Sequence, residues 1–211
     1  MRPTRISYNT DLTAFTRCLL ECYKQEVEAM NKEIQNMSEI EKLCSLLAQY
    51  IVVPENVQVP ENLMIAGGVG SGKTTLLKAL FRTLSLDAEY DFTTRKKKEV
   101  GNLNLNRFIS AKELIKLTQS IGEFPNLYVD YNYFLLIDDV GSEETFVKSY
   151  GTTIRVMEDI ICMRADRGMR TIISTNYDKD ALGRYYQSVR VADRLKDYAL
   201  IEMNNQSYRG L

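Results

Sequence analysis

Residues 67 to 74 read Gly67-Gly68-Val69-Gly70-Ser71-Gly72-Lys73-Thr74, which matches the pattern GxxxxGK[ST] at every fixed position. A short apolar run, Asn62 to Ala66, precedes this stretch, and a helix-like apolar pattern, Thr74 to Leu84, follows it. Glycine permits positive φ and close backbone approach, so successive N–H groups can point at one anion beside a positively polarised helix N-terminus. The sequence therefore predicts a phosphate-binding loop, with a glycine-rich turn that holds no ligand as the alternative.

The residue types of this loop also predict how a nucleotide is held. The Lys73 ammonium is expected to reach the β- and γ-phosphates, and the Thr74 hydroxyl is expected to coordinate magnesium. Lys73 then serves both binding and catalysis. The expected nucleotide contacts in the loop are Gly67, Gly68, Val69, Gly70, Ser71, Gly72, Lys73, Thr74 and Thr75.

Residues 133 to 139 form an apolar run that ends in two carboxylates, Asp138 and Asp139. An unbroken apolar run is typical of a central parallel strand that is covered on both faces. Ligands of open α/β sheets bind at the carboxyl ends of the strands, so both carboxylates are expected beside the phosphate loop. We assign Asp138 to magnesium and Asp139 to the activation of water, with a surface turn carrying two exposed acids as the alternative.

The remaining core sequence alternates between strand-like and helix-like segments. Strands are expected at 108–109, 170–175 and 198–203, and helices at 111–118, 150–167 and 187–196. This alternation predicts an α/β fold with three layers around a central parallel sheet, as in a P-loop NTPase.

The N-terminal region has a different pattern. Apolar side chains recur at helical spacing between residues 10 and 37, and Ser38 to Glu41 has the form of a capping box that opens a second helix. Pro54 to Pro60 is typical of a linker. We therefore predict a helical arm with its linker helix over 1–55 and the nucleotide-binding core over 56–211. The arm either packs on its own domain or serves as a partner-binding or coiled-coil element.

Composition narrows the class of protein. The chain has 211 residues, of which 45% are hydrophobic and 26% charged, so it is globular; its net charge of −1 limits any nucleic-acid surface to a local patch. The absence of histidine excludes serine–histidine or cysteine–histidine nucleophiles and histidine zinc sites. The sequence has no signal-peptide pattern and no apolar stretch of about 18 residues. We expect a soluble cytoplasmic protein without membrane contact, whose four cysteines are reduced.

From Ser38 to Leu211 the order of motifs resembles the AAA+ ATPases of the DnaC and DnaI helicase-loader type and the related IstB transposition helpers. Besides the phosphate loop, the motifs are Asp138-Asp139-Val140-Gly141, Ser174-Thr175-Asn176, Ala192-Asp193-Arg194-Leu195 and Ser207-Tyr208-Arg209. The resemblance implies ATP and Mg²⁺ as cofactors. It also implies a sensor I role for Asn176, an arginine finger directed into a neighbouring subunit for Arg194, and a sensor II-like role for Arg209.

Each of these roles has an alternative. Asn176 is otherwise a turn residue after a strand. Arg190 is the second candidate for the finger, and a surface salt bridge is the other interpretation of Arg194.

The resemblance further implies an ATPase that loads or remodels a replicative helicase on single-stranded DNA and forms nucleotide-dependent homo-oligomers. The alternatives are an IstB-type helper on double-stranded DNA and a nucleotide-gated binding module with negligible turnover. A basic run is the candidate DNA contact, although such a run is more often a solvated loop: Arg95, Lys96, Lys97 and Lys98. Many AAA+ proteins have glutamate where Asp139 stands, so we expect slow hydrolysis.

Overall fold

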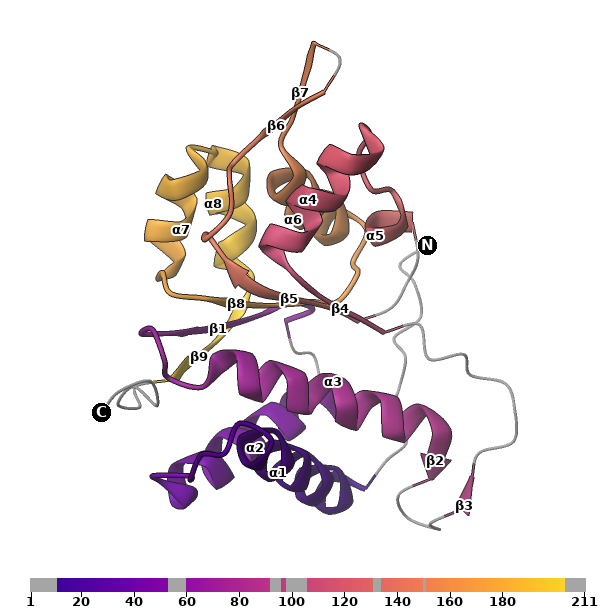
Figure 1. The fold of residues 1–211 in the computed structure, drawn as a ribbon, viewed down its shortest axis with the longest axis vertical. Coiled ribbons are helices and arrows are strands. Elements are labelled where there is room, and N and C mark those ends of the chain that lie inside the picture. Colours follow the sequence, from indigo (N-terminus) through magenta and orange to yellow (C-terminus); the bar gives the residue numbers. More distant parts are fainter. Residues whose placement is uncertain are drawn as a thin grey trace. The chain divides into compact units, whose positions relative to one another are not determined.

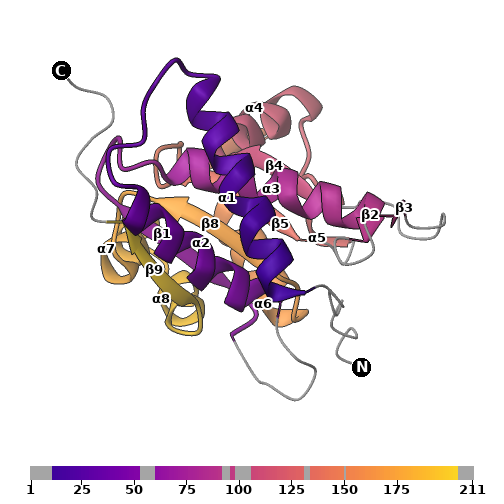
Figure 2. The same ribbon diagram turned by 90° about the horizontal axis from the view of Figure 1, so that it is seen from below.

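The computed structural model describes residues 11–52, 60–91, 96–97, 106–130, 134–149 and 151–203 (Figures 1 and 2). Contacts along the chain divide these residues into two compact units. The first unit contains the described residues within 60–74 and 107–211, and the second contains those within 4–59 and 75–106. Contacts therefore group the described residues within 75–106 with the N-terminal helices. The predicted domain boundary between residues 55 and 56 stays a prediction.

The first unit is built on a parallel sheet of five strands (Figure 1). Its strands lie in the order β4-β5-β8-β1-β9, and every neighbouring pair is parallel. The inner strands consist almost entirely of buried residues, as expected where both faces of a strand are covered. Their bounds are β1 Leu63–Gly67, β4 Arg107–Ser110, β5 Leu135–Val140, β8 Thr171–Thr175 and β9 Ala199–Met203.

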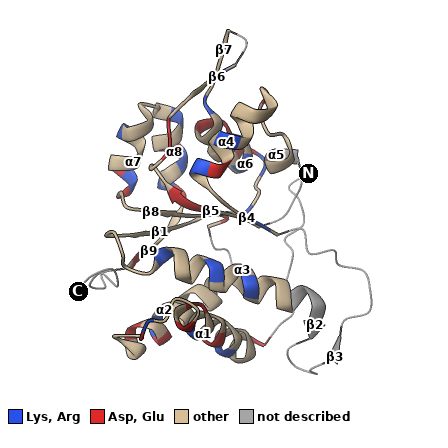
Figure 3. Ribbon diagram, in the orientation of Figure 1, with Lys and Arg blue, Asp and Glu red and all other residues tan. Residues whose placement is uncertain are grey.

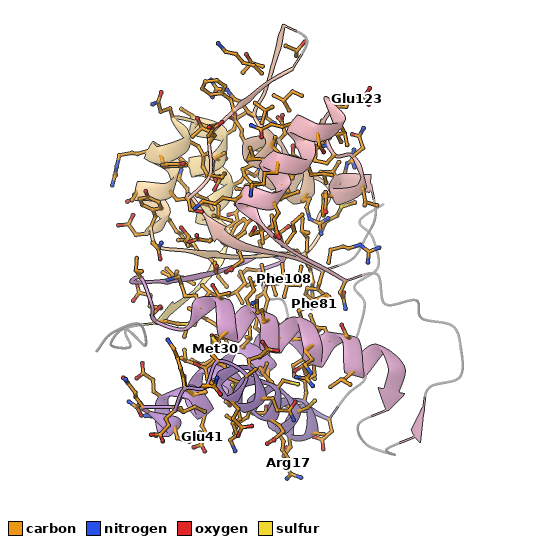
Figure 4. All side chains as sticks on the ribbon, viewed as in Figure 1. Arg17, Met30, Glu41, Phe81, Phe108 and Glu123 are labelled. Atoms are coloured by element: carbon orange, nitrogen blue, oxygen red, sulfur yellow. The ribbon has the colours of Figure 1, made fainter. Side chains whose placement is uncertain are left out.

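The helices of this unit lie against one face of the sheet (Figure 1), and side chains fill the layer between them (Figure 4). The first of them begins with a capping box, because the Ser110 hydroxyl accepts from the Glu113 N–H and the Glu113 carboxylate accepts from the Ser110 N–H. The bounds are α4 Ala111–Ile121, α5 Leu127–Asp130, α6 Val156–Asp166, α7 Lys179–Tyr186 and α8 Val189–Lys196. The predicted α/β class with a central parallel sheet is confirmed.

The predicted strand with its two carboxylates is β5, which continues one residue beyond Asp139 to Val140. Two other local features of this unit differ from the prediction. The helix predicted from residue 150 begins at Val156, because β7 (Thr152–Ile154) pairs with β6 (Val147–Ser149) in an antiparallel hairpin. The helix α7 was not predicted at all, although Asp178 caps it through a hydrogen bond from the Ala181 N–H.

The second unit consists of α1 (Leu12–Glu28), α2 (Met37–Ile51) and the part of α3 (Lys73–Glu89) that follows Thr74, together with the short strands β2 (Tyr90–Asp91) and β3 (Lys96–Lys97). Both N-terminal helices pack on each other through buried apolar side chains. An ion pair of 3.9 Å between Arg82 and Glu26 joins α3 to α1.

The N-terminal helices differ from the prediction in two details. The helix predicted over 10–37 ends at Glu28, because the chain turns there and Asn31 has a left-handed φ of 54°. The second helix begins one residue before Ser38, and its cap is Asn36, whose side chain accepts from the Glu39 N–H at 3.2 Å. Among the described residues, no helix is both long enough and apolar enough to span a membrane.

Candidate functional site

The strand order brings three polar strand ends to one edge of the sheet. Strand β8 lies between β1, which leads into the phosphate loop, and β5, which carries the two carboxylates. Thr175 of β8 pairs with Ala66 on one side and with Val140 on the other, so these ends are level. The carboxyl edge of a parallel sheet is where open α/β folds bind ligands. Figure 3 shows acidic residues on β5 at this edge.

Lys73, the first residue of α3, lies at the centre of this edge. Its Nζ donates to the carbonyl oxygens of Gly67 and Gly68 at 2.8 Å each, and to Ser71 Oγ at 3.4 Å. The same ammonium lies 2.8 Å from Asn176 Oδ1, directly after β8. The side chain of Lys73 is buried, so these oxygens offset the loss of water around its charge. The predicted binding lysine and the predicted sensor asparagine are therefore in direct contact.

Glycine is required in the loop for two different reasons. A Cβ on Gly67 would lie 2.4 Å from the backbone oxygen of Met203 on β9, so only a hydrogen fits where the loop begins. Gly70 and Gly72 have φ values of 82° and 94°, a region that other residues rarely adopt. Val69, directly before Gly70, is exposed.

The predicted metal ligands also lie together. The Thr74 hydroxyl donates to Asp138 Oδ1 at 3.1 Å, and Asp138 is buried. A second hydroxyl, that of Ser174 in β8, donates to the same oxygen at 2.5 Å. A threonine hydroxyl and a carboxylate are oxygen donors of the kind that Mg²⁺ prefers, with phosphate and water completing its shell. This pair of residues therefore fits magnesium.

Asp139 has an unusual backbone conformation. Its φ is 58°, which is left-handed, and the pairing of β5 with β8 shifts register between Ile137 and Val140. Aspartate tolerates this conformation better than most residues, and such outliers are concentrated at functional sites. The Asp139 N–H donates to Ser174 Oγ at 2.9 Å, and Asn176 Nδ2 lies 3.5 Å from Asp139 Oδ1. The half-buried carboxylate is thereby placed next to Asn176.

Ser174 is the site residue that sequence reasoning missed. Its hydroxyl contacts both acidic residues, and the residue is 1% exposed. A serine inside the apolar run of β8 was a visible signal, because a buried hydroxyl requires hydrogen-bond partners.

Arg194 lies on α8 and makes different contacts. Its guanidinium is 2.6 Å from Asp166 of α6 and 3.5 Å from Asp193, and the hydrogen bond to Asp166 raises the pKa of Arg194. Arg190, the second candidate, is exposed on the same helix. The role of either arginine in a neighbouring subunit stays a prediction.

Several predicted residues lie outside the described part of the chain. These are Arg209, Arg95 and Lys98, while Lys96 and Lys97 are described only as the backbone of β3.

Comparison with known proteins supports the fold. No family model matches the sequence, and no curated protein matches it. Among solved structures, DnaI matches with a TM-score of 0.56 and 18% identity over 88% of this chain and 93% of its own. A primosome component from Streptococcus pyogenes serotype M3 matches with a TM-score of 0.54 and 17% identity, covering 92% and 96%.

The DnaC helicase loader matches with a TM-score of 0.51 and 20% identity, covering 82% of this chain and 94% of its own. The chain spans only 41% and 48% of two DnaA structures that it also matches. The predicted resemblance is confirmed at the level of the fold: this chain has the P-loop AAA+ fold that DnaI and DnaC share.

Proposed function

We propose that this chain binds ATP with magnesium, hydrolyses it slowly, and uses this cycle to load or remodel a replicative helicase on single-stranded DNA. One observation carries the proposal: the Lys73 ammonium lies 2.8 Å from Asn176 Oδ1, where the phosphate loop and the end of β8 meet. Thr74 contacts Asp138, and Asn176 reaches Asp139. Groups suited to phosphate, metal and water thus lie within hydrogen-bonding reach of one another.

Binding of ATP follows from the contacts of the loop. Lys73 exchanges the carbonyl oxygens of Gly67 and Gly68 for oxygens of the β- and γ-phosphates, which its compact ammonium charge suits. Thr74 coordinates magnesium through its hydroxyl, and Asp138 holds the ion directly or through water. Magnesium, when bound, offsets the negative charge that develops on the transferred phosphoryl group.

Hydrolysis requires a water that is oriented and deprotonated. Asp139 supplies the carboxylate for this step, and the Asn176 amide holds the water or contacts the γ-phosphate. The separation of 3.5 Å between Asn176 Nδ2 and Asp139 Oδ1 is consistent with one water being shared by both side chains. Because aspartate is one methylene shorter than glutamate, its carboxylate reaches less far, and we expect slow turnover.

The role in replication is supported by the fold of the DnaC helicase loader and by a DnaA structure that holds AMPPCP and single-stranded DNA. Arg95, Lys96, Lys97 and Lys98 are the proposed DNA contacts, and each phosphate that they neutralise would steepen the salt dependence of binding. Arg194 would act on the nucleotide of a neighbouring subunit in a nucleotide-dependent homo-oligomer. Arg209 would contact the nucleotide within its own subunit.

The nucleotide chemistry is tested with two variants and one control. Lys73→Ala should abolish binding of a fluorescent ATP analogue, whereas Lys78→Ala, an exposed lysine of the same helix, should bind as the wild type does. Asp139→Asn should bind ATP with unchanged affinity and release no phosphate. Normal hydrolysis by Asp139→Asn would contradict its role as the base. ATP binding without any hydrolysis by the wild type would instead favour the nucleotide-gated binding module.

The assembly is tested by sedimentation with a slowly hydrolysed ATP analogue, with and without single-stranded DNA. We expect oligomers with the analogue, and their loss in Arg194→Ala but not in Arg184→Ala, an exposed arginine on α7. A monomer under every condition would contradict the oligomer. Preferential assembly on double-stranded DNA would favour the IstB-type helper.

A further inference from the structure

Glu143 is a buried acid in the turn that follows β5. It is 4% exposed, and both of its carboxylate oxygens accept hydrogen bonds. Oε2 accepts from the Gly141 N–H at 2.8 Å, and Oε1 accepts from the Tyr186 hydroxyl. Burial raises the pKa of the Glu143 carboxyl, whereas the hydrogen bond from Tyr186 lowers it. Burial also raises the pKa of Tyr186, so that its phenol remains a donor.

These contacts close the turn around Asp139. The Ser142 hydroxyl donates to the Asp139 carbonyl at 2.7 Å, and the Ser142 N–H donates to the same oxygen at 3.2 Å. Gly141 has a φ of 92°, and a Cβ on it would lie 2.7 Å from the ring of Tyr177. The left-handed Asp139 thus begins a tight turn that Glu143 ends. A change in the position of Glu143 would alter the direction of the Asp139 carboxylate.

The same glutamate connects this turn to α7. Tyr186 binds its side chain, and the hydroxyl of Tyr185 donates to its backbone oxygen. Tyr185 in turn stacks on Tyr177, the residue after Asn176, with ring centroids 5.5 Å apart. The segments that follow β5 and β8 in the candidate site are therefore both attached to the last turn of α7.

Helix α7 is packed closely on α8. A Cβ on Gly183 of α7 would lie only 2.9 Å from the Cβ of Ala192 of α8, so the helices cannot approach further. Because closely packed protein interiors are hard to compress, a displacement of one helix is transmitted to the helix packed against it. A continuous series of contacts thus runs from Asp139 through Glu143 and α7 to α8, which carries the exposed Arg190 and the ion-paired Arg194.

We propose that Glu143 is a positioning residue that ties the turn carrying Asp139 to α7, so that the rate of ATP hydrolysis depends on the position of the α7–α8 helix pair. This inference rests on the proposed ATPase activity. Glu143 does not touch the nucleotide. It acts by fixing the direction of the Asp139 carboxylate. The hydrogen bonds of Lys73 to Gly67 and of Thr74 to Asp138, the residues proposed to hold ATP and magnesium, do not involve Glu143.

The test separates hydrolysis from binding. Glu143→Ala should lower kcat on the order of tenfold, as removal of supporting hydrogen bonds around a catalytic group commonly does, with the affinity for a fluorescent ATP analogue unchanged. Rates are expressed per nucleotide-binding site, so a loss of folded protein does not count as a loss of rate. Glu144→Ala, the exposed neighbouring glutamate, is the matched control and should leave kcat and affinity unchanged.

Glu143→Gln distinguishes positioning from proton transfer. A glutamine can accept from the Gly141 N–H through its oxygen and donate to the Tyr186 oxygen through its amide, so it should restore most of the lost kcat. A glutamine variant as slow as the alanine variant would overturn the positioning role. Tyr186→Phe removes one hydroxyl and keeps the ring, and it should lower kcat several-fold even if Glu143→Ala does not fold.

Wild-type kcat in Glu143→Ala, or in Tyr186→Phe, would overturn the inference while leaving the ATPase intact. If the wild-type protein neither binds nor hydrolyses ATP, the proposed function itself is refuted. The two failures are therefore distinguishable.

Discussion

Replacing Ser174 with alanine should lower the free energy of unfolding of the first unit, because the substitution removes a buried hydroxyl that makes two hydrogen bonds. The residue is 1% exposed, and the hydroxyl donates to Asp138 Oδ1 at 2.5 Å and accepts from the Asp139 N–H at 2.9 Å. A hydrogen bond to a charged group contributes about 1.5–3 kcal/mol, and a buried N–H without a partner costs about 1–3 kcal/mol. Because these effects overlap at one site, we expect the free energy of unfolding to fall by about 3 kcal/mol.

The measurement is urea unfolding followed by far-UV circular dichroism without nucleotide. Ser120→Ala is the control, because this exposed serine on α4 donates only to the Leu117 carbonyl at 2.8 Å, and it should change stability by less than about 0.5 kcal/mol.

A double-mutant cycle with Asp138→Asn isolates the contact of Ser174 with the carboxylate. A hydrogen bond to a neutral amide is roughly half as strong as one to a carboxylate, so Ser174→Ala should cost about 1 kcal/mol less in the Asp138→Asn background. Additive effects in the cycle, or a cost no greater than that of Ser120→Ala, would refute this reasoning.

Four further outcomes are expected. Gly67→Ala should weaken binding of the fluorescent ATP analogue at least tenfold, since its Cβ would lie 2.4 Å from the Met203 oxygen and displace the loop; unchanged affinity would contradict this. Arg164→Met, which removes a fully buried guanidinium bound to backbone oxygens, should destabilise the protein by about 3 kcal/mol or more in thermal unfolding. Burial raises the pKa of Cys44 to about 12, so this thiol should resist alkylation by iodoacetamide at pH 9 until the protein unfolds. Mass spectrometry of the alkylated protein is the measurement. EDTA should weaken ATP binding in the wild type but have less effect in Asp138→Asn, as measured by titration calorimetry.

The parts of the fold and site that the sequence predicted are those with strong local chemistry. The GxxxxGK[ST] run specifies its own strand, loop and helix, and the two acids after an apolar run indicate a neighbouring strand of the same sheet. The structure brings Lys73, Thr74, Asp138, Asp139 and Asn176 into one cluster.

The parts that the sequence did not predict depend on tertiary packing. Ser174 looks like a minor interruption of an apolar strand until β8 is placed between β1 and β5, where its hydroxyl meets both acids. Helix α7 spans only eight residues, about two turns, which is too short for its helical period to be recognised in the sequence. The hairpin of β6 and β7 has strands of only three residues, too short for an alternating pattern to be recognised.

The position of β8 in the sheet also affects the order in which contacts of the candidate site form during translation. The contact between Lys73 and Asn176 joins residues that are 103 positions apart, and Asn176, which directly follows β8, is synthesised well after the phosphate loop. Contacts of such long range form late, because a long loop must close before they stabilise the chain. During translation, the phosphate loop would therefore emerge from the ribosome well before its asparagine partner. A growing chain would gain its full affinity for nucleotide only when the sheet is nearly complete, and from then on nucleotide would stabilise the folded form.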